Sequence, residues 1–404
     1  MKKFLVLPGS KWQYALVEKI KSMGHQVLVV SPEECPPCAE IADVFFRSDI
    51  FAVDAIEQFA KVAGADAIIS DECDIAMPVI AELGKRLSLP AMSCADAALY
   101  TDKFLMREFC KEHGLKSPEY CLCHTEEDAL RFFRDLGKPM IIKPLDSNAS
   151  RGVFKIGNEA ALHEHFQEAY SFSRVEKAVL AERFITGTEF TVDGIKTPSA
   201  HYTLAISEKR HYKHNPNIAN ELYFTHSNPN YDYDQLRAAN DAFVMHSTLP
   251  FGFTHAEYKY EDGAFYLIEI GARGGGNMIS SVITQHMSGY DTYDYLIQCS
   301  LGNIKESDFS IRPEYKSRAA VLKFFETPHG GGKVTAISGK DYLDSEPDIK
   351  EYRMYFKPGS VIQNAANDST RIGFFIACSE SVEQLEHVIA EVNKHVEIKV
   401  DTNL

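Results

Sequence analysis

Short apolar runs alternate with helical patterns over residues 4–90. The runs "FLVL", "QVLVV" and "DAIIS" have the length and composition of buried strands, while "WQYALVEKIKSMG" and "VDAIEQFAKVAG" repeat apolar residues at helical spacing. Strands that alternate with helices are typical of βαβ units around a parallel sheet. Residues 1–95 are therefore predicted to form an N-terminal βαβ domain. Its first turn, "LPGSKW", lacks the G-x-G-x-x-G spacing of a dinucleotide site.

The pattern changes beyond this first domain. A predicted helix ends at Gly114, and a strand, a helix and the strand "KPMIIKP" follow it. Hairpin-like runs come next, "GVFKI", "AVLAERFI" and "TEFTVDG". We predict an α/β protein. Its core, residues 96–308, is expected to be an α+β unit of two lobes, of which the central lobe covers about 115–185. A small α+β domain is expected at the C-terminus, over 309–404. The polar stretch 211–230 is predicted to be turn-rich and to shape a substrate pocket.

Composition and charge exclude several classes of protein. The net charge of −15 argues against a nucleic acid or an anionic membrane surface as partner. No apolar run approaches the roughly 20 residues needed to span a bilayer, and the N-terminal "KKFLVL" is too short for a signal-peptide core. The nine cysteines are scattered and odd in number, which favours reduced thiols and a cytoplasmic protein. Neither close pair, Cys35/Cys38 or Cys121/Cys123, has the second pair that a zinc site needs.

Two glutamates flank a predicted hairpin in "HAEYKYEDGAFYLIEI". Glu269 lies inside the apolar run "LIEI", where an unpaired carboxylate is costly. A two-residue turn at Asp262 and Gly263 would put Glu257 and Glu269 on opposite faces of the hairpin. We predict a three-residue turn with Gly263 at positive φ, because it puts both carboxylates on one face, where Mg²⁺ would relieve their repulsion. The alternative is that both acids face solvent.

Two lysines and a small polar loop are candidates for binding phosphate. Lys143 ends the buried run "PMIIK", and the loop "DSNASRG" follows it between two strands. Ser147, Ser150 and Gly152 would let backbone N–H groups of this loop approach a phosphate closely. Lys103 opens a predicted helix, where its charge opposes the helix dipole, which favours a binding role. The alternative for both lysines is a charge that reaches solvent.

The segment "AERFITGTEFTVD" is a candidate for binding a flat base. Glu182, Arg183, Phe184 and Ile185 end an apolar strand and lead into an extended linker. Free backbone groups between apolar residues can read the edge of a base. Glu189, seven residues after Glu182, can hold ribose hydroxyls. The alternative is a hairpin with surface acids.

Together these motifs, in this order, resemble the ATP-grasp superfamily of ATP-dependent carboxylate–amine ligases. The resemblance covers about residues 96–308, and that superfamily likewise has a βαβ domain before the core and a small domain after it. It implies that ATP binds between two lobes together with Mg²⁺, for which Mn²⁺ is an alternative. The implied ATP-binding residues are Lys103, Lys143, Ser147, Ser150, Gly152, Glu182, Arg183, Phe184, Ile185 and Glu189, and the implied metal ligands are Glu257 and Glu269.

The motif "EIGAR", where many members of the superfamily have "EINPR", is similar to the L-amino-acid ligases. Gly271 stands where those members have an asparagine that ligates the metal, so the third metal ligand is open. Arg273 is the implied catalytic residue, since a guanidinium can stabilise an acyl-phosphate and a phosphoryl group in transfer; the alternative is a salt bridge at a strand end. His255, Gly275 and Asn277 are candidates for substrate contact. For His255 the alternative is a packed hairpin histidine.

The implied function is that of an ADP-forming ligase, which joins a carboxylate to an amine through an acyl-phosphate, with an amino acid as substrate. Its partners are then small-molecule carboxylates and amines, with no nucleic acid and no membrane. Two alternatives stay open: another ATP-grasp reaction, such as carboxylation or a purine-type ligation, and an ATP-binding protein without catalysis. Dimers are common in families that the chain resembles, so a homodimer is also an open alternative.

Overall fold

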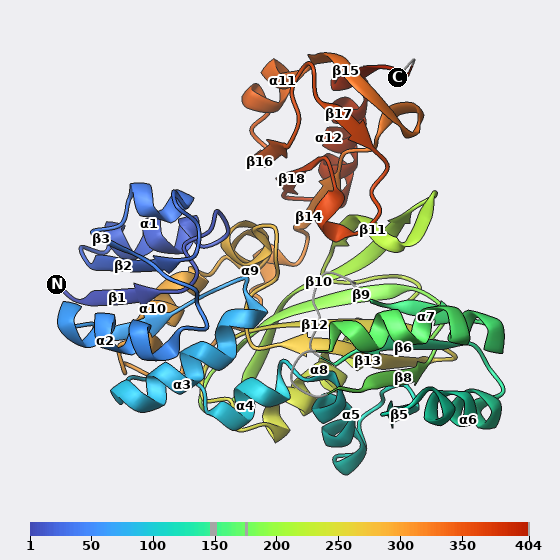
Figure 1. Cartoon of the computed structure of the whole chain (residues 1–404). Helices are drawn as coiled ribbons and strands as arrows, with labels where there is room; N and C mark the ends of the chain where they lie inside the picture. The colour runs from blue at the N-terminus through green and yellow to red at the C-terminus, as the bar shows by residue number, and fades with distance from the viewer. Residues whose placement is uncertain (146–151, 174–176, 403–404) are drawn as a thin grey trace.

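The N-terminal domain is built on a parallel sheet, as predicted. The computed structural model describes residues 1–145, 152–173 and 177–402, and its first sheet has the strand order β3–β2–β1–β4 (Figure 1). One face packs on α1 and on α10 (Thr292–Ser300), which comes from the predicted core range, and the other face packs on α2 and α3. The bounds are β1 (Lys3–Val6), β2 (Gln26–Ser31), β3 (Val44–Arg47), β4 (Ala67–Ile69), α1 (Tyr14–Ser22), α2 (Val53–Ala63) and α3 (Met77–Leu87).

The central lobe is an antiparallel sheet with the strand order β5–β8–β6–β7, covered by α6 and α7. Helix α6 begins at a capping box, in which Thr125 and Asp128 exchange hydrogen bonds, and ends at Gly137 in the left-handed conformation. This sheet positions Lys143 and the linker after β8. The bounds are β5 (Tyr120–Cys123), β6 (Met140–Pro144), β7 (Phe154–Ile156), β8 (Val179–Arg183), α6 (Glu126–Leu136) and α7 (Glu159–Phe172).

An eight-stranded antiparallel sheet runs from the core into the C-terminal domain, in the order β13–β12–β9–β10–β11–β14–β18–β16. Much of the stretch 211–230 is strand, because β11 pairs on one side with β10 and on the other with β14. The prediction that this stretch is turn-rich is wrong. The bounds are β9 (Glu189–Lys196), β10 (His201–Tyr212), β11 (Asn215–Phe224), β12 (Gly252–Glu261), β13 (Ala264–Gly271), β14 (Ala319–Phe324), β16 (Ile349–Met354) and β18 (Gly373–Ser379).

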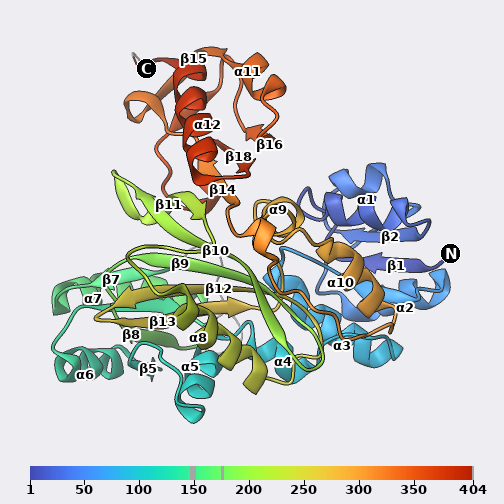
Figure 2. The same cartoon turned by 180° about the vertical axis from the view of Figure 1, so that it is seen from behind.

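The C-terminal domain continues the large sheet beyond β11, where β14 pairs with residues 221–224 (Figure 2). Helix α12 packs against β14 and β18, and a small sheet of β17, β15 and β19 lies beside it. No helix in the described ranges is long and apolar enough to cross a membrane. The predicted fold class is confirmed, while the domain boundaries at 95 and 308 stay predictions. The remaining bounds are α4 (Cys94–Leu99), α5 (Lys103–Glu112), α8 (Tyr233–His246), α9 (Thr284–Ser288), α11 (Lys340–Ser345), α12 (Val382–His395), β15 (Gly331–Ser338), β17 (Val361–Gln363) and β19 (Glu397–Asp401).

Candidate nucleotide and metal site

The β12–β13 hairpin closes with a two-residue turn, not with the predicted three-residue turn. Glu261 pairs with Ala264, so the loop consists of Asp262 and Gly263, at φ 50° and 80°. Positive φ at both positions marks a type I′ turn, whose twist matches that of the flanking strands. The predicted loop length is therefore wrong, while the positive φ of Gly263 is confirmed.

A β-bulge, not the turn, brings the two metal-ligand candidates to one face. Tyr258 pairs with Leu267, but the next pair along the strands is Glu257 with Glu269, so Ile268 is an extra residue in β13. One extra residue reverses the alternation of side chains beyond it. Glu257 and Glu269 are thereby direct cross-strand partners on one face. They share a face as predicted, but the bulge produces this and not the length of the turn.

Arg107 satisfies the carbonyl of the bulged residue. This arginine comes from α5, is fully buried, and donates from Nη2 to the Ile268 carbonyl. Its Nε donates to Glu182 Oε1 at 2.7 Å, and Glu182 Oε2 lies 2.7 Å from Lys143 Nζ. One buried chain of contacts thus joins the β12–β13 hairpin, called the metal hairpin from here on, to Lys143, the phosphate-binding candidate of the central lobe. Arg107 was not among the residues predicted from sequence.

The same contacts involve Glu182, which is expected from the sequence to line the adenine. Its carboxylate is buried and engaged by two cations, and its backbone lies in the sheet between β5 and β6, so its expected place at the adenine stays a prediction. Burial lowers the pKa of Lys143 to about 8, and the charges of Arg107 and Lys103 add to this shift while Glu182 opposes it. Burial also works against the ionised form of Glu182, but the two cations outweigh it and lower that pKa.

A lysine ammonium lies against each of the two metal-ligand candidates. Lys103 Nζ is 2.8 Å from Glu269 Oε1. Lys209 Nζ is 2.8 Å from Glu257 Oε1 and 2.6 Å from Glu189 Oε1. Burial works against ionisation of Glu269, but the charge and hydrogen bond of Lys103 outweigh it and lower the pKa. Lys209, which sequence analysis missed, thus links the ribose candidate to the metal pair.

The carboxylate pair fits a hard divalent cation. Mg²⁺ takes oxygen ligands and is usually held by one or two carboxylates, with water and substrate phosphates in the rest of its shell. Glu257 and Glu269 supply such a pair, and within the described ranges no group of three or more His, Cys, Asp or Glu side chains is arranged to hold a metal. Lys103 and Lys209 show that positive charge is accommodated at both carboxylates.

The linker after β8 has fewer free groups than predicted. The Arg183 and Phe184 amides donate to Glu119 O at 2.8 Å and to Pro139 O at 2.9 Å, and the Arg183 guanidinium pairs with two glutamates. These groups are therefore not free to read a base. The Ile185 amide, by contrast, donates to no acceptor in the described part of the chain. It is the backbone group of this linker that suits an adenine ring.

Glu189, the predicted ribose ligand, lies among two lysines and a histidine. Besides Lys209, the His211 Nε2 is 3.5 Å and the Lys259 Nζ 3.7 Å from its Oε2. Burial works against its ionisation, but the Lys209 charge and the other neighbours hold its pKa well below the usual range. Glu189 is thus an ionised acceptor at the edge of the metal hairpin.

The predicted phosphate loop is described only at its end. Ser147 and Ser150 lie outside the described residues. Gly152 has φ 73°, and a Cβ there would lie 2.7 Å from the Phe172 ring and 2.9 Å from Pro144. Gly152 therefore ends this loop packed against the central lobe.

Arg273 is held by a carboxylate from the N-terminal domain. Its Nε and Nη2 lie 2.8 and 2.7 Å from the two oxygens of Asp74. Burial works against ionisation of Asp74, but Arg273 outweighs it and lowers the pKa. Asp74 belongs to the acidic segment 70–74, "SDECD", which directly follows β4. Ligands of α/β sheets bind outside the carboxyl ends of strands, so this segment is a signal that sequence analysis missed.

Asp74 also accounts for the glycine at position 271. A Cβ on Gly271 would lie 2.7 Å from Asp74 Oδ1, so an asparagine there and the Asp74–Arg273 pair exclude each other. Gly274 is equally constrained, since its Cβ would lie 2.4 Å from Ser280 Cβ and 2.6 Å from Asp71 Oδ1. Gly271 and Gly274 therefore allow the acidic segment to approach the backbone closely.

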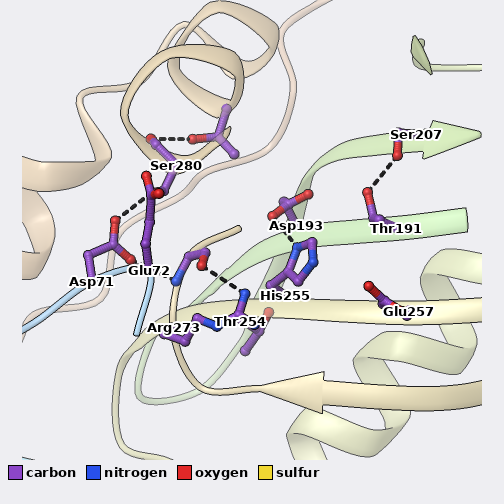
Figure 3. Close-up of polar contacts among 12 residues, drawn as sticks. Asp71, Glu72, Thr191, Asp193, Ser207, Thr254, His255, Glu257, Arg273 and Ser280 are labelled. Atoms are coloured by element: carbon purple, nitrogen blue, oxygen red, sulfur yellow. Dashed lines mark hydrogen bonds and ion pairs between the residues drawn. The ribbon is translucent and has the colours of Figure 1, made fainter. Parts of the chain in front are cut away.

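Asp71 and Glu72, two further acids of the segment 70–74, face the glycine-rich stretch 274–278 (Figure 3). Asp71 accepts a hydrogen bond from the Gly274 N–H at 2.8 Å and others from two hydroxyl groups. The Met278 N–H lies 3.1 and 3.2 Å from the two oxygens of Glu72. Burial, followed by the charge of Asp71, raises the pKa of Glu72 well above its usual value. Neither acid forms an ion pair within the described ranges.

Of the three substrate candidates, His255 has the best-defined surroundings. Its Nδ1 lies 2.8 Å from Asp193 Oδ1, and both side chains are buried (Figure 3). A Cβ on Gly275 would lie 2.5 Å from Asp193 Oδ1 and 2.9 Å from His255 Nδ1, so Gly275 packs directly on this pair. Asn277 follows at φ 57°. The structure thus packs Gly275 against His255, which lies on β12 of the β12–β13 hairpin.

Two family models match the chain. The ATP-grasp domain model matches residues 136–281, and the model of L-amino acid ligase C-terminal domain 2 matches residues 324–401. Dapdiamide A synthase of Enterobacter agglomerans is 23% identical over 308 residues, which cover 73% of this chain and 71% of that protein. A phosphoribosylamine–glycine ligase of Thermococcus gammatolerans is 22% identical over 418 aligned positions, which cover 97% of this chain and 91% of that protein.

Solved structures resemble the whole chain. The L-amino acid ligase from Bacillus licheniformis has a TM-score of 0.82 and 20% identity, covering 100% of this chain and 99% of that one. Phosphoribosylglycinamide synthetase from Anaerococcus prevotii has a TM-score of 0.74 and 17% identity, covering 99% and 100%. At such identities the likeness establishes the fold alone.

The fold and the match to the ATP-grasp domain model imply the use of ATP and a divalent metal. Residues 136–281 carry an ATP-grasp domain, and the chain is an ADP-forming ligase. Its C-terminal domain is of the L-amino acid ligase type, so the resemblance found in the sequence is confirmed.

Proposed function

We propose that this ligase activates the carboxylate of an amino acid with ATP and joins it to an amine, with Mg²⁺ as the metal. The observation that supports this most is the pairing of Glu257 with Glu269 through the bulge at Ile268. Glu269 of that pair lies on β13, which ends two residues before Arg273. A metal-ligand pair and a guanidinium at one strand end suit the transfer of a phosphoryl group.

In the proposed complex, ATP lies between the central lobe and the β12–β13 hairpin. Lys103 and Lys143 exchange their glutamate partners for phosphate oxygens. The Ile185 amide reads the adenine ring, and Glu189 accepts hydrogen bonds from the ribose. Glu257 and Glu269 would hold Mg²⁺, whose positive charge would stabilise the phosphates.

The proposed reaction has two steps. In the first, a carboxylate oxygen attacks the γ-phosphorus of ATP, the bond from that phosphorus to the β–γ bridging oxygen breaks, and ADP leaves with the electron pair. In the second, a neutral amine attacks the acyl carbon, the carbon–oxygen bond to the phosphate breaks, phosphate leaves, and the nitrogen loses a proton to water. Arg273 stabilises the charge that develops on the phosphoryl oxygens.

The acidic segment after β4 supports an amino acid as the activated substrate. Asp71 and Glu72 are adjacent acids beside residues 272–278, called the Arg273 loop from here on. Neither acid forms an ion pair within the described ranges. Buried carboxylates without a cation are costly. The ammonium group of an amino acid would supply that cation while its carboxylate faces Arg273, and it would counter the raised pKa of Glu72.

The experiment is an assay of ADP release with ATP, Mg²⁺ and L-amino acids, singly and in pairs, with hydroxylamine as a trapping amine in parallel. We expect ADP release that depends on the amino acid, and an acyl hydroxamate from the same amino acids. Glu257→Gln should lower both on the order of 1000-fold. The matched control, Glu397→Gln on the exposed strand β19, should change neither. ADP release that is indifferent to every amino acid would contradict the proposal.

A further inference from the structure

A cavity of about 220 Å³ lies behind the metal hairpin, lined by residues 114–116, by α8 and by both strands of the hairpin. Tyr258 and Leu267 form part of its wall, and they are the regular cross-strand pair next to the bulge. Side chains alternate along a strand, so Tyr258 points to the opposite face of the hairpin from Glu257. The cavity, called the rear cavity from here on, therefore lies on the other face of the hairpin from the two metal-ligand candidates.

The interior of the rear cavity is apolar. Phe243 from α8, Tyr258 from β12 and Phe265 from β13 line it together with leucine, alanine and glycine residues. A water molecule in a cavity needs roughly two to four polar partners, and apolar cavities of about 150 Å³ stay dry and bind benzene. Aromatic side chains also favour a further ring in edge-to-face contact. The rear cavity therefore suits an aromatic ring better than it suits water.

The mouth of the rear cavity carries a positive charge. Lys116 is exposed there, its Nζ lies 5.7 Å from the ring centroid of Tyr266, and it forms no ion pair with a described residue. None of the ten residues that line the cavity is acidic, although the chain has a net charge of −15. A carboxylate at the mouth would pair with Lys116, whereas an ammonium group would be repelled by it. The charge at the mouth thus complements an anionic end of a ligand whose ring lies inside.

The wall of the rear cavity is part of the structure that holds the bulge. The Leu267 N–H donates to the Lys116 carbonyl at 3.0 Å, and the next residue along β13, Ile268, is the bulged one. A ligand in the cavity would pack on Tyr258 and Leu267 from behind, where the regular pairing of the two strands stops. Because the bulge aligns the two metal-ligand candidates, such a ligand would favour the conformation that binds metal.

We propose that the rear cavity binds a small aromatic carboxylate, with its ring between α8 and the hairpin and its carboxylate at Lys116, and that this ligand tightens the binding of metal and nucleotide. The binding site depends on the cavity alone, while its coupling to the opposite face rests on the proposed metal pair. Coupling between two sites is reciprocal. The factor by which the ligand changes the affinity for nucleotide must therefore equal the factor by which nucleotide changes the affinity for the ligand.

The binding test titrates the unmodified chain with 3-phenylpropionate by calorimetry, without nucleotide. Ala239→Leu fills the cavity from α8 and should abolish binding, while Ala238→Leu, at the exposed neighbouring position outside the lining, is the matched control and should bind normally. Lys116→Gln should weaken the binding of 3-phenylpropionate about 10-fold and leave that of 3-phenylpropanamide unchanged. Its control is Lys111→Gln, at an exposed lysine of α5. Phenethylamine, which carries an ammonium in place of the carboxylate, should not bind.

The coupling test repeats the titration with a nonhydrolysable ATP analogue and Mg²⁺ present. We expect each ligand to tighten the binding of the other by the same factor, about 5-fold or more, and Ala239→Leu to remove the effect. The site is overturned if the unmodified chain does not bind 3-phenylpropionate at millimolar concentration, or if Ala239→Leu binds it as well as Ala238→Leu does. Equal binding of phenethylamine would overturn the choice of a carboxylate, and affinities that do not respond to each other would overturn the coupling.

The two proposals fail in different ways. A chain that binds no nucleotide analogue with Mg²⁺ would contradict the proposed metal pair. The titration without nucleotide would then still decide for the rear cavity, because it compares Ala239→Leu with Ala238→Leu and Lys116→Gln with Lys111→Gln in the absence of any metal.

Discussion

The two halves of the candidate site are built in different ways. At the metal hairpin, the bulge carbonyl, Arg107, Glu182 and Lys143 form one buried chain of contacts. At the Arg273 loop, the contacts join separate domains, because the segment 70–74 of the N-terminal domain packs against Gly271 and Gly274 of the core. The first half should therefore govern stability and ATP binding, while the second should govern turnover and the choice of substrates.

The largest effect expected is the loss of stability in Arg107→Leu. The change removes one cation from Glu182 and the donor to the Ile268 carbonyl. Removing one partner of a buried ion pair costs roughly 3–5 kcal/mol, to be measured by urea unfolding. ATP binding should weaken as well, because the bulge is no longer held. Arg131→Gln on the exposed face of α6 is the control, and an Arg107→Leu chain as stable as this control would show that the contacts do not hold the hairpin.

Arg273→Ala should instead act on turnover. Its guanidinium is needed as charge develops on the phosphoryl oxygens, so turnover should fall roughly 100- to 1000-fold with little change in the KM for ATP. Arg273→Lys should recover part of the rate, since it keeps the charge but not the bidentate contact with Asp74. Initial rates of ADP release over a range of ATP concentrations measure both quantities. A raised KM for ATP at unchanged turnover would assign Arg273 to nucleotide binding and remove the contrast between the two halves.

Gly263→Val tests whether the turn affects the metal pair at a distance. Gly263 has φ 80° with open space around it, so the substitution introduces backbone strain without a clash. That strain should lower the free energy of unfolding by about 1–2 kcal/mol and should weaken Mg²⁺-dependent ADP release. Gly157→Val also has open space, but its φ is ordinary, and it serves as the control. If both variants behaved alike, the turn would have no role in placing the glutamates.

The smallest effect expected is a pH dependence of ATP binding. Because burial lowers the pKa of Lys143 to about 8, this side chain loses its proton as the pH rises through that value. Binding of phosphate above pH 8 then requires uptake of a proton, so the Kd for ATP should rise about tenfold per pH unit there and stay flat below. Lys143→Arg keeps its charge and should give a flat profile from about pH 7 to 9. Calorimetric titration of ATP at several pH values makes the comparison, and an equally flat profile for the unmodified chain would contradict the assignment.

Much of the fold can be predicted from local patterns. The N-terminal parallel sheet and the helix that starts at Lys103 have periodicities that the sequence displays directly. The stretch 211–230 is different, because its strands are stabilised by partners far along the chain, as in the pairing of Glu221 with Lys323. A polar composition predicts turns there, and only the tertiary partner makes it a strand.

The site shows the same limit. Glu257 and Glu269 are conspicuous as acids in an apolar hairpin, but the bulge that aligns them leaves no mark in composition. Its donor, Arg107, precedes Ile268 by 161 residues, and Asp74 precedes Arg273 by 199. Contacts over such separations depend on how the domains pack, which local propensity does not encode.

The metal pair is tested most directly by a crystal structure of the chain with a nonhydrolysable ATP analogue and Mn²⁺, in which anomalous scattering locates the metal. We expect an anomalous peak in contact with both Glu257 and Glu269 and with the phosphates, between the central lobe and the β12–β13 hairpin. Lys103 and Lys209 should have moved away from the two carboxylates. A metal that contacts only one of the two glutamates, or a nucleotide bound at the N-terminal parallel sheet, would contradict the assigned site.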